Sequence, residues 1–208
     1  MQDTLVTDPR TGKTTGLAKT VRRAIKALEQ SGIPYCVIGA TALAVRGLPR
    51  MTRDLDIAVR AEDSRVAIAA LRKLHFRQAT PAASEQDDEF MVLFVDPATG
   101  VEVDLLAAAG DPESTVIGQA RKANTFGVLA RVASLEHLLL LYLYSNQPRH
   151  FGDFGTIIQS GRADLKRAQE MLAEMHPEML REWKRRVKEI EKLPPAPRKP
   201  RNGREKRP

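Results

Sequence analysis

Two aspartates, Asp54 and Asp56, stand one residue apart in the segment MTRDLDIAV at residues 51–59. Residues i and i+2 of a strand share one face and lie about 6.6 Å apart, so both carboxylates would project from the same side. The opposite face would carry the apolar residues Leu55, Ile57 and Val59. Like charges on one face repel each other, and a divalent cation between them would remove the repulsion. The pair therefore indicates either a metal site or a solvated strand face.

A second acidic segment, VEVDLL at residues 101–106, places Glu102 and Asp104 on one strand face. Mg²⁺ prefers oxygen ligands and commonly binds carboxylates together with substrate phosphates, and Mn²⁺ accepts the same ligands. Two such ions can hold the attacking and leaving oxygens of a phosphoryl displacement, and a carboxylate can accept the proton of the attacking hydroxyl. We therefore expect Asp54, Asp56 and Asp104 to form one cluster with Mg²⁺ (or Mn²⁺) as cofactor.

A candidate phosphate-binding segment precedes the aspartates. The residues VIGATALAVRG at 37–47 read as a strand, Gly39 and the start of a helix. Glycine lets a phosphate approach the backbone, and a helix start offers unpaired N–H groups. Gly39, Ala40 and Thr41 are therefore candidates for holding a triphosphate. Each segment alone is a weak signal, because most Asp-x-Asp pairs and glycine turns have no catalytic role. Their order and spacing along one chain are the stronger indication of a shared site.

Together these segments resemble the polymerase-beta-like nucleotidyltransferases, and within them the minimal and AbiEii-type (abortive-infection or toxin-like) proteins. The resemblance rests on GATALA at 39–44, RDLD at 53–56 and VDLL at 103–106, and it continues into the segment at 135–154. It implies a metal-dependent enzyme that transfers a nucleoside monophosphate from an NTP to a hydroxyl or phosphate acceptor. The acceptor would be RNA, a protein side chain or a small molecule. A toxin of this type would have an antitoxin partner.

The resemblance also implies that Arg53 and Asp153 contact the nucleotide. Three positions depart from the family pattern: Ala40 replaces a second glycine or serine, Tyr142 a common lysine, and His150 a frequent aspartate. The family lysine is thought to contact the nucleotide phosphates, and a tyrosine supplies no positive charge. Two hypotheses remain: an active enzyme in which another cation compensates, with Arg53 as first choice, or an altered nucleotide- or RNA-binding module that transfers nothing.

Hydrophobic spacing predicts the elements that would position these residues. It predicts helices at 15–30, 40–47 and 64–74, strands at 35–39 and 55–60, and an antiparallel hairpin of 90–95 with 101–106. Residues 111–132 are ambiguous, with strand character at 126–132. Further helices are predicted at 135–145 with Ser134 as N-cap, at 151–159, at 163–175 and at 177–192. With the resemblance, the expected fold class is α+β: a nucleotidyltransferase-like mixed sheet flanked by helices, followed by a C-terminal helical region.

Composition suggests a division of the chain into an α/β core at 1–132, a helical region at 133–192 and a disordered basic tail at 193–208. Residues 184–208 hold 11 Lys and Arg against 3 Asp and Glu, a net of +8, so the remainder carries 7 − 8 = −1 of the total charge of +7. The tail is rich in proline and poor in apolar residues, which is typical of disorder. It would either contact nucleic-acid phosphates or simply be solvated.

Several further properties concern the cellular setting. The sequence has no apolar run long enough to span a membrane and no signal-peptide pattern at its start. Cys36 is the single cysteine, which excludes a disulfide framework and fits a reduced compartment. The sequence therefore predicts a cytoplasmic protein with NTP as its partner and no membrane association.

Overall fold

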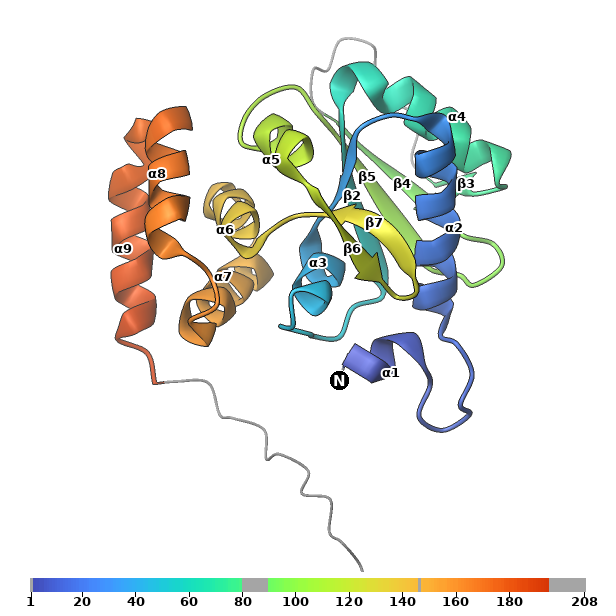
Figure 1. The fold of residues 1–208 in the computed structure, drawn as a ribbon, viewed down its shortest axis with the longest axis horizontal. Helices are drawn as coiled ribbons and strands as arrows, with labels where there is room; N and C mark the ends of the chain where they lie inside the picture. The colour runs from blue at the N-terminus through green and yellow to red at the C-terminus, as the bar shows by residue number, and fades with distance from the viewer. Residues whose placement is uncertain (1, 80–89, 146, 195–208) are drawn as a thin grey trace, which may run out of the picture.

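The computed structural model of the chain describes residues 2–79, 90–145 and 147–194. Within them lies a mixed sheet of seven strands in the order β3-β4-β5-β2-β1-β7-β6 (Figure 1). The strands are β1 (Tyr35–Val37), β2 (Asp54–Arg60), β3 (Arg77–Gln78), β4 (Phe90–Val95), β5 (Glu102–Ala108), β6 (Arg121–Thr125) and β7 (Val128–Val132). The tail predicted at 193–208 lies, after Pro194, outside the described residues.

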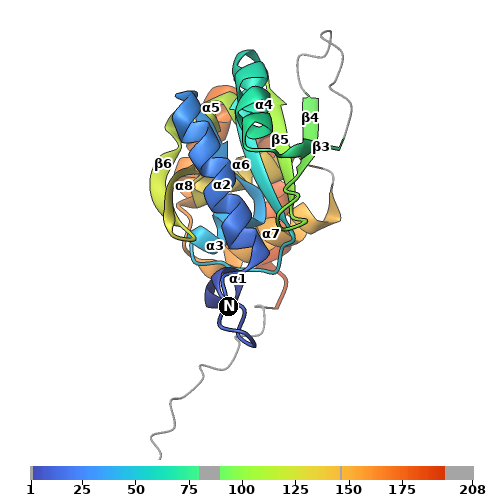
Figure 2. The same cartoon turned by 90° about the vertical axis from the view of Figure 1, so that its right-hand side faces the viewer.

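Helices flank this sheet and follow it in the chain. They are α1 (Gln2–Val6), α2 (Gly16–Ser31), α3 (Gly39–Val45), α4 (Ser64–Lys73), α5 (Glu113–Gln119), α6 (Leu135–Tyr144), α7 (Pro148–Ser160), α8 (Leu165–Met175) and α9 (Leu180–Glu191). Figures 1 and 2 show α2 and α4 on one face of the sheet and α3 and α5 on the other, with α6 to α9 beyond α3 and α5. This arrangement confirms the α+β class and the helical C-terminal part. Among the described residues, no helix is both long and apolar enough to cross a membrane.

The two central strands, β2 and β5, run parallel and are hydrogen-bonded to each other. β1 pairs antiparallel with β2 and parallel with β7, while β4 pairs antiparallel with β5. Because side chains alternate along a strand, the apolar residues Leu55, Ile57 and Val59 of β2 face the core under α2 and α4, where all are fully buried. Asp54 and Asp56 consequently face the side covered by α3.

Local sequence signals set several helix ends, among them the N-cap predicted at Ser134. Thr15 caps α2, since its Oγ1 accepts a hydrogen bond from the backbone N–H of Ala18 at 3.2 Å, and Gly32 ends the helix with φ +74°. Ser134 caps α6 in the same way by accepting from the N–H of His137 at 3.2 Å. The predicted hairpin of β4 and β5 is confirmed, with Leu93 opposite Asp104.

Residues 111–132 form more structure than the sequence indicated. They contain α5 and a complete antiparallel hairpin of β6 and β7, of which only the β7 part was predicted. The start predicted for the last helix at residue 177 is wrong, because Pro177–Met179 forms a separate 3-10 turn before α9. The helix predicted at 151–159 begins earlier, at Pro148, which brings Arg149 into its first turn.

Candidate metal and nucleotide site

The three predicted metal ligands converge at the centre of the sheet. Asp56 on β2 lies directly opposite Asp104 on β5, and Asp54 lies opposite Glu102. Because β2 and β5 are parallel neighbours, paired residues point to the same face of the sheet. Each of Asp54, Asp56 and Asp104 places one carboxylate oxygen within 4.8 Å of the others, and all three residues are half-buried.

The carboxylates of this acidic cluster destabilise one another's charged forms. Burial, together with the negative charges of Asp54 and Asp104, raises the pKa of Asp56 from 3.8 to about 7. Burial and the charges of Asp54 and Glu102 also raise the pKa of Asp104. A half-buried group of carboxylates with such repulsion is the environment that a divalent cation would stabilise.

Gly39 is held against the cluster by backbone geometry that favours glycine. It opens α3 with φ +61°, and a Cβ atom built there would overlap Oδ2 of Asp56 and lie 2.6 Å from its carboxyl carbon. The preceding residue, Ile38, donates its N–H to the backbone oxygen of Asp56 at 3.0 Å. The first turn of α3 thus begins directly beside the acidic cluster, where its N–H groups lack helical partners.

The other two residues of the predicted phosphate-binding segment lie deeper. Ala40 and Thr41 are fully buried, and Oγ1 of Thr41 has no hydrogen-bond partner in the described part of the chain. Contact of Thr41 with a triphosphate through its hydroxyl therefore requires a shift of its surroundings. The backbone N–H groups in the first turn of α3 could contact a phosphate without such a shift.

Arg50 bonds Asp153 of α7 and also acts on the acidic cluster through its charge. Its Nε donates to both carboxylate oxygens of Asp153, at 2.8 and 3.0 Å. Asp153 is 5% exposed, so this charge is neutralised inside the protein rather than presented to a ligand. The positive charge of Arg50 also lowers the pKa of Asp56, a minor effect beside burial.

Among the described residues, Arg149 forms an ion pair with the acidic cluster: its Nη1 lies 3.9 Å from Oδ2 of Asp54. It stands in the first turn of α7, and its side chain is half exposed. Arg53, the cation preferred from sequence, is exposed and makes no hydrogen bond or ion pair with the described residues. A contact between Arg53 and a nucleotide stays a prediction.

A hollow of about 330 Å³ opens beside Asp56, between the sheet and α6. It is lined by Gly39 and Asp56 on the sheet side and by Tyr142, Tyr144 and His150 on the helical side, among others. Tyr142 stacks on His150 with ring centroids 4.8 Å apart. The hydroxyls of Tyr142 and Tyr144 have no hydrogen-bond partners among the described residues. Two residues that depart from the family pattern thus line the space next to the acidic cluster.

Sequence reasoning did not select Tyr144 or Ser145, which also line this hollow. Oγ of Ser145 lies 2.6 Å from Nδ1 of His150. Both residues lie at the end of α6, next to the predicted position 142. Spacing along the helix does not show that Tyr144 and Ser145 face the site, because this depends on how α6 packs on the sheet.

A mixed sheet with this strand arrangement, flanked by helices and carrying the acidic cluster at its centre, is a nucleotidyltransferase-like fold. Two solved structures of the antibiotic-resistance factor ANT(2'')-Ia show the likeness. Its solution structure superposes with a TM-score of 0.54 and 15% identity, covering 77% of this chain and 91% of that chain. Its crystal structure with adenylyl-2''-tobramycin gives a TM-score of 0.55 and 16% identity, covering 79% and 99%. At these identities the likeness concerns the fold.

No protein-family model and no curated protein sequence matches the chain.

Proposed function

We propose that the protein is a metal-dependent nucleotidyltransferase that moves a nucleoside monophosphate from an NTP to a hydroxyl or phosphate acceptor. The convergence of Asp54, Asp56 and Asp104 beside the glycine that opens α3 is the observation that carries this proposal. The fold shared with ANT(2'')-Ia, whose crystal structure contains an adenylylated compound, supports it. The narrower likeness to AbiEii-type proteins stays a prediction.

The residues of the cluster fit Mg²⁺ or Mn²⁺. All three donors are carboxylates, which both ions prefer. Their mutual repulsion, expressed in the raised pKa values of Asp56 and Asp104, would be relieved by a divalent charge. When bound, such ions polarise the phosphate oxygens and neutralise the charge that develops during transfer.

The residues of the chain then have distinct roles. Asp54 and Asp56 hold the metal-binding position from β2, and Asp104 accepts the proton of the acceptor hydroxyl or completes the ligand set from β5. The acceptor oxygen forms a bond to the α-phosphorus, the bond from that phosphorus to the bridging oxygen breaks, and pyrophosphate leaves. The β2–β5 pairing fixes the relative positions of Asp56 and Asp104, so the groups need little reorganisation.

The triphosphate would lie between the start of α3 and the helical region. The N–H groups of Gly39, Ala40 and Thr41 would face the phosphates, as predicted from sequence. Arg149 would supply the positive charge that the family lysine supplies elsewhere, with Arg53 as the second candidate. Asp153 would act through Arg50, which it holds by an ion pair in which Nε of Arg50 donates to both carboxylate oxygens.

The acceptor remains one of three kinds: RNA, a protein side chain or a small molecule. The likeness to ANT(2'')-Ia favours a small molecule bearing a hydroxyl group. A toxin role with an antitoxin partner would instead require a macromolecular acceptor. The rival function is a module that binds nucleotide or RNA without transfer, and the tyrosine at position 142 is the observation that favours it.

Label transfer separates these alternatives. The full chain is incubated with each α-labelled NTP and Mg²⁺, and with total RNA, a protein extract or a panel of hydroxylated small molecules. We expect label in one acceptor class with release of an equal amount of pyrophosphate, and loss of both with EDTA or in Asp104→Asn. Metal-dependent NTP binding without pyrophosphate release under any of these conditions would establish the rival.

A further inference from the structure

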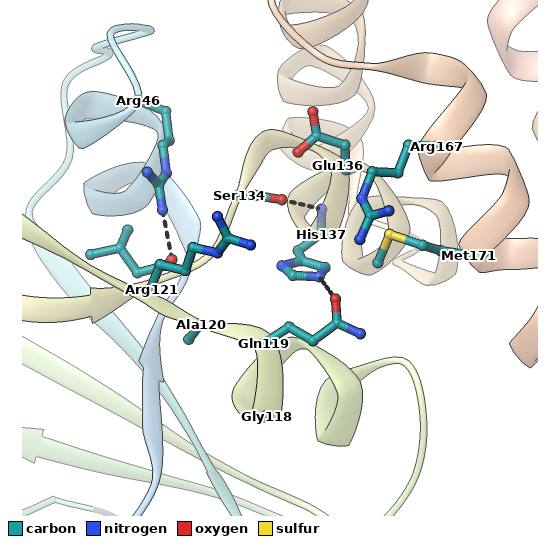
Figure 3. Close-up of a pocket in the computed structure, with 11 residues that line it drawn as sticks. Arg46, Gly118, Gln119, Ala120, Arg121, Ser134, Glu136, His137, Arg167 and Met171 are labelled. Carbon is teal, nitrogen blue, oxygen red and sulfur yellow. Dashed lines mark hydrogen bonds between the residues drawn. The ribbon is translucent and has the colours of Figure 1, made fainter.

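Figure 3 shows the residues that line a second hollow, of about 710 Å³. The hollow lies at the C-terminal end of α3 and the N-terminal end of α6, away from the acidic cluster. Its polar and charged walls include Arg46, Gln119, Arg121, Glu136, His137 and Arg167. It shares no lining residue with the hollow beside Asp56. Arg46 follows the last residue of α3, about 10 Å along the axis from Gly39. The hollow is therefore a separate site.

Positive charge dominates this second hollow. Among the described lining residues are three arginines and one carboxylate, Glu136, whose Oε1 already accepts the N–H of Asp164 at 2.9 Å. The exposed guanidinium groups of Arg121 and Arg167 make no hydrogen bond or ion pair within the described chain. Unpaired guanidinium groups that face one cavity repel one another, and an anion between them would remove the repulsion.

Arg46 gives the hollow a fixed cation. Its Nε donates to the carbonyl of Ala133 at 2.8 Å and its Nη2 to the carbonyl of Val132 at 2.7 Å. These two bonds to the backbone hold the guanidinium plane in place beside the cavity. A cation that is already immobilised loses little conformational freedom when it binds a ligand.

His137 supplies a buried polar group without a full set of partners. Its side chain lies among the lining residues, and the residue is 5% exposed. Nε2 lies 3.3 Å from Oε1 of Gln119, whereas Nδ1 has no partner among the described residues. Figure 3 shows the ring between the guanidinium groups of Arg121 and Arg167. Burial lowers the pKa of His137, and the three arginines lower it further against the opposing charge of Glu136.

We propose that this hollow binds a small phosphate-bearing molecule, with Arg121 and Arg167 contacting the phosphate at the mouth, Arg46 at the wall and His137 within. Arginine forks match phosphate oxygens, and a group with more than one negative charge suits several converging cations better than a single carboxylate does. The volume lies in the range of ligand cavities, about 300–1,000 Å³. None of the described residues that line it is Phe, Tyr or Trp, so they offer no stacking surface of the kind typical of a single-stranded nucleic-acid groove.

Titration of the full chain with inorganic pyrophosphate or AMP, in EDTA, tests this site apart from the metal cluster. The ring ¹⁵N and ¹H resonances of His137 report binding locally by NMR. We expect them to shift with at least one probe, and the comparison of the two affinities distinguishes an inorganic polyphosphate from a nucleotide. Asp104→Asn, which should abolish NMP transfer, should leave this response intact, so the two proposals can fail separately.

A pair of double variants with equal charge loss completes the test. Arg121→Ala with Arg167→Ala should weaken binding at least tenfold. Lys122→Ala with Lys166→Ala removes the neighbouring cations, which pair with Glu29 and Glu170 outside the hollow, and should change the affinity less than twofold. The proposal is overturned by equal weakening in both variants or by the absence of a His137 response to both probes. A response only to an RNA oligonucleotide would overturn the small-molecule class.

Discussion

Asp56 and Asp104 lie directly opposite each other on two parallel strands, and their carboxylates share the sheet face that Gly39 approaches. Neither residue has a cation of the chain bonded to its carboxylate among the described contacts. Both have raised pKa values, chiefly through burial. Two such groups placed together therefore destabilise the folded protein at neutral pH when no ligand is bound.

We expect Asp56→Asn to stabilise the metal-free protein at pH 8. The pKa of Asp56 in the fold is about 7, above its ordinary 3.8, so its favourable contribution is complete below about pH 4 and is lost as pH rises through 7. The variant avoids this loss. In EDTA its Tm should exceed that of the wild type by several degrees at pH 8 and by less at pH 5, since ~1 kcal/mol shifts Tm by about 2–4 °C in a chain of this size.

The exposed residue Glu62 gives the control, because Glu62→Gln removes a carboxylate from just beyond β2. Its Tm should follow the wild type at both pH values. A lower Tm for Asp56→Asn at pH 8 would show that the Asp56 charge is compensated in the free protein.

Gly39→Ala should weaken Mn²⁺ binding and lower activity, whereas a glycine substitution with the same backbone strain elsewhere should not. The added methyl group overlaps the carboxylate of Asp56, and the positive φ adds strain of about 1–2 kcal/mol. Gly161→Ala is the matched control, because Gly161 has φ +64° with nothing within 4 Å of an added Cβ. Both variants should lose stability in denaturant unfolding through the backbone strain, Gly39→Ala the more because of the overlap with Asp56, and only Gly39→Ala should lose Mn²⁺ affinity. Equal Mn²⁺ affinity in the two variants would contradict the close approach of Gly39 to the cluster.

Arg149→Ala should weaken NTP binding about tenfold or more. The side chain lies 3.9 Å from Asp54, so its charge is placed to contact a phosphate of a metal-bound nucleotide, and a charge-assisted hydrogen bond contributes about 1.5–3 kcal/mol. Arg53→Ala is the comparison, measured by calorimetry under the same conditions. A larger effect of Arg53→Ala would show that Arg53, the cation preferred from the sequence, makes the phosphate contact instead of Arg149.

The position of the family lysine gives a further test. Tyr142 lines the hollow beside Asp56 and is 3% exposed, so a lysine there would be enclosed with the nucleotide rather than solvated. Tyr142→Lys should tighten NTP binding about tenfold if the triphosphate lies in this hollow. Tyr142→Phe, which removes only the unpartnered hydroxyl, should leave the affinity within about twofold. No gain in Tyr142→Lys with a preserved fold would place the triphosphate elsewhere.

The sequence could predict the acidic cluster because strand alternation is local. Asp54 and Asp56 share a face by their spacing, and so do Glu102 and Asp104. The parallel pairing of β2 with β5, which brings Asp56 opposite Asp104, is a long-range contact that the spacing within either strand does not determine, and only the structure shows it. Helix α5 was missed because its short segment ESTVIGQ contains a glycine and has few apolar residues at helical spacing.

The cation of the site shows a second limit of sequence reasoning. Arg53 adjoins Asp54 in the chain, but successive residues of a strand point to opposite faces, so adjacency in sequence does not place a side chain beside its neighbour. Arg149 is 95 residues from Asp54 by number and approaches it because α7 begins at Pro148 and packs beside α6. The second hollow was also beyond sequence reasoning, since its arginines come from three separate elements.

The location of a bound ion tests the central claim most directly. A crystal of the protein soaked with Mn²⁺ and a non-hydrolysable NTP analogue would be measured by anomalous diffraction. We predict an anomalous peak in contact with carboxylate oxygens of Asp54, Asp56 and Asp104, with the α-phosphate of the analogue beside it. A nucleotide bound with no Mn²⁺ at these three aspartates, or Mn²⁺ bound only elsewhere, would contradict a metal-dependent nucleotidyltransferase centred on them.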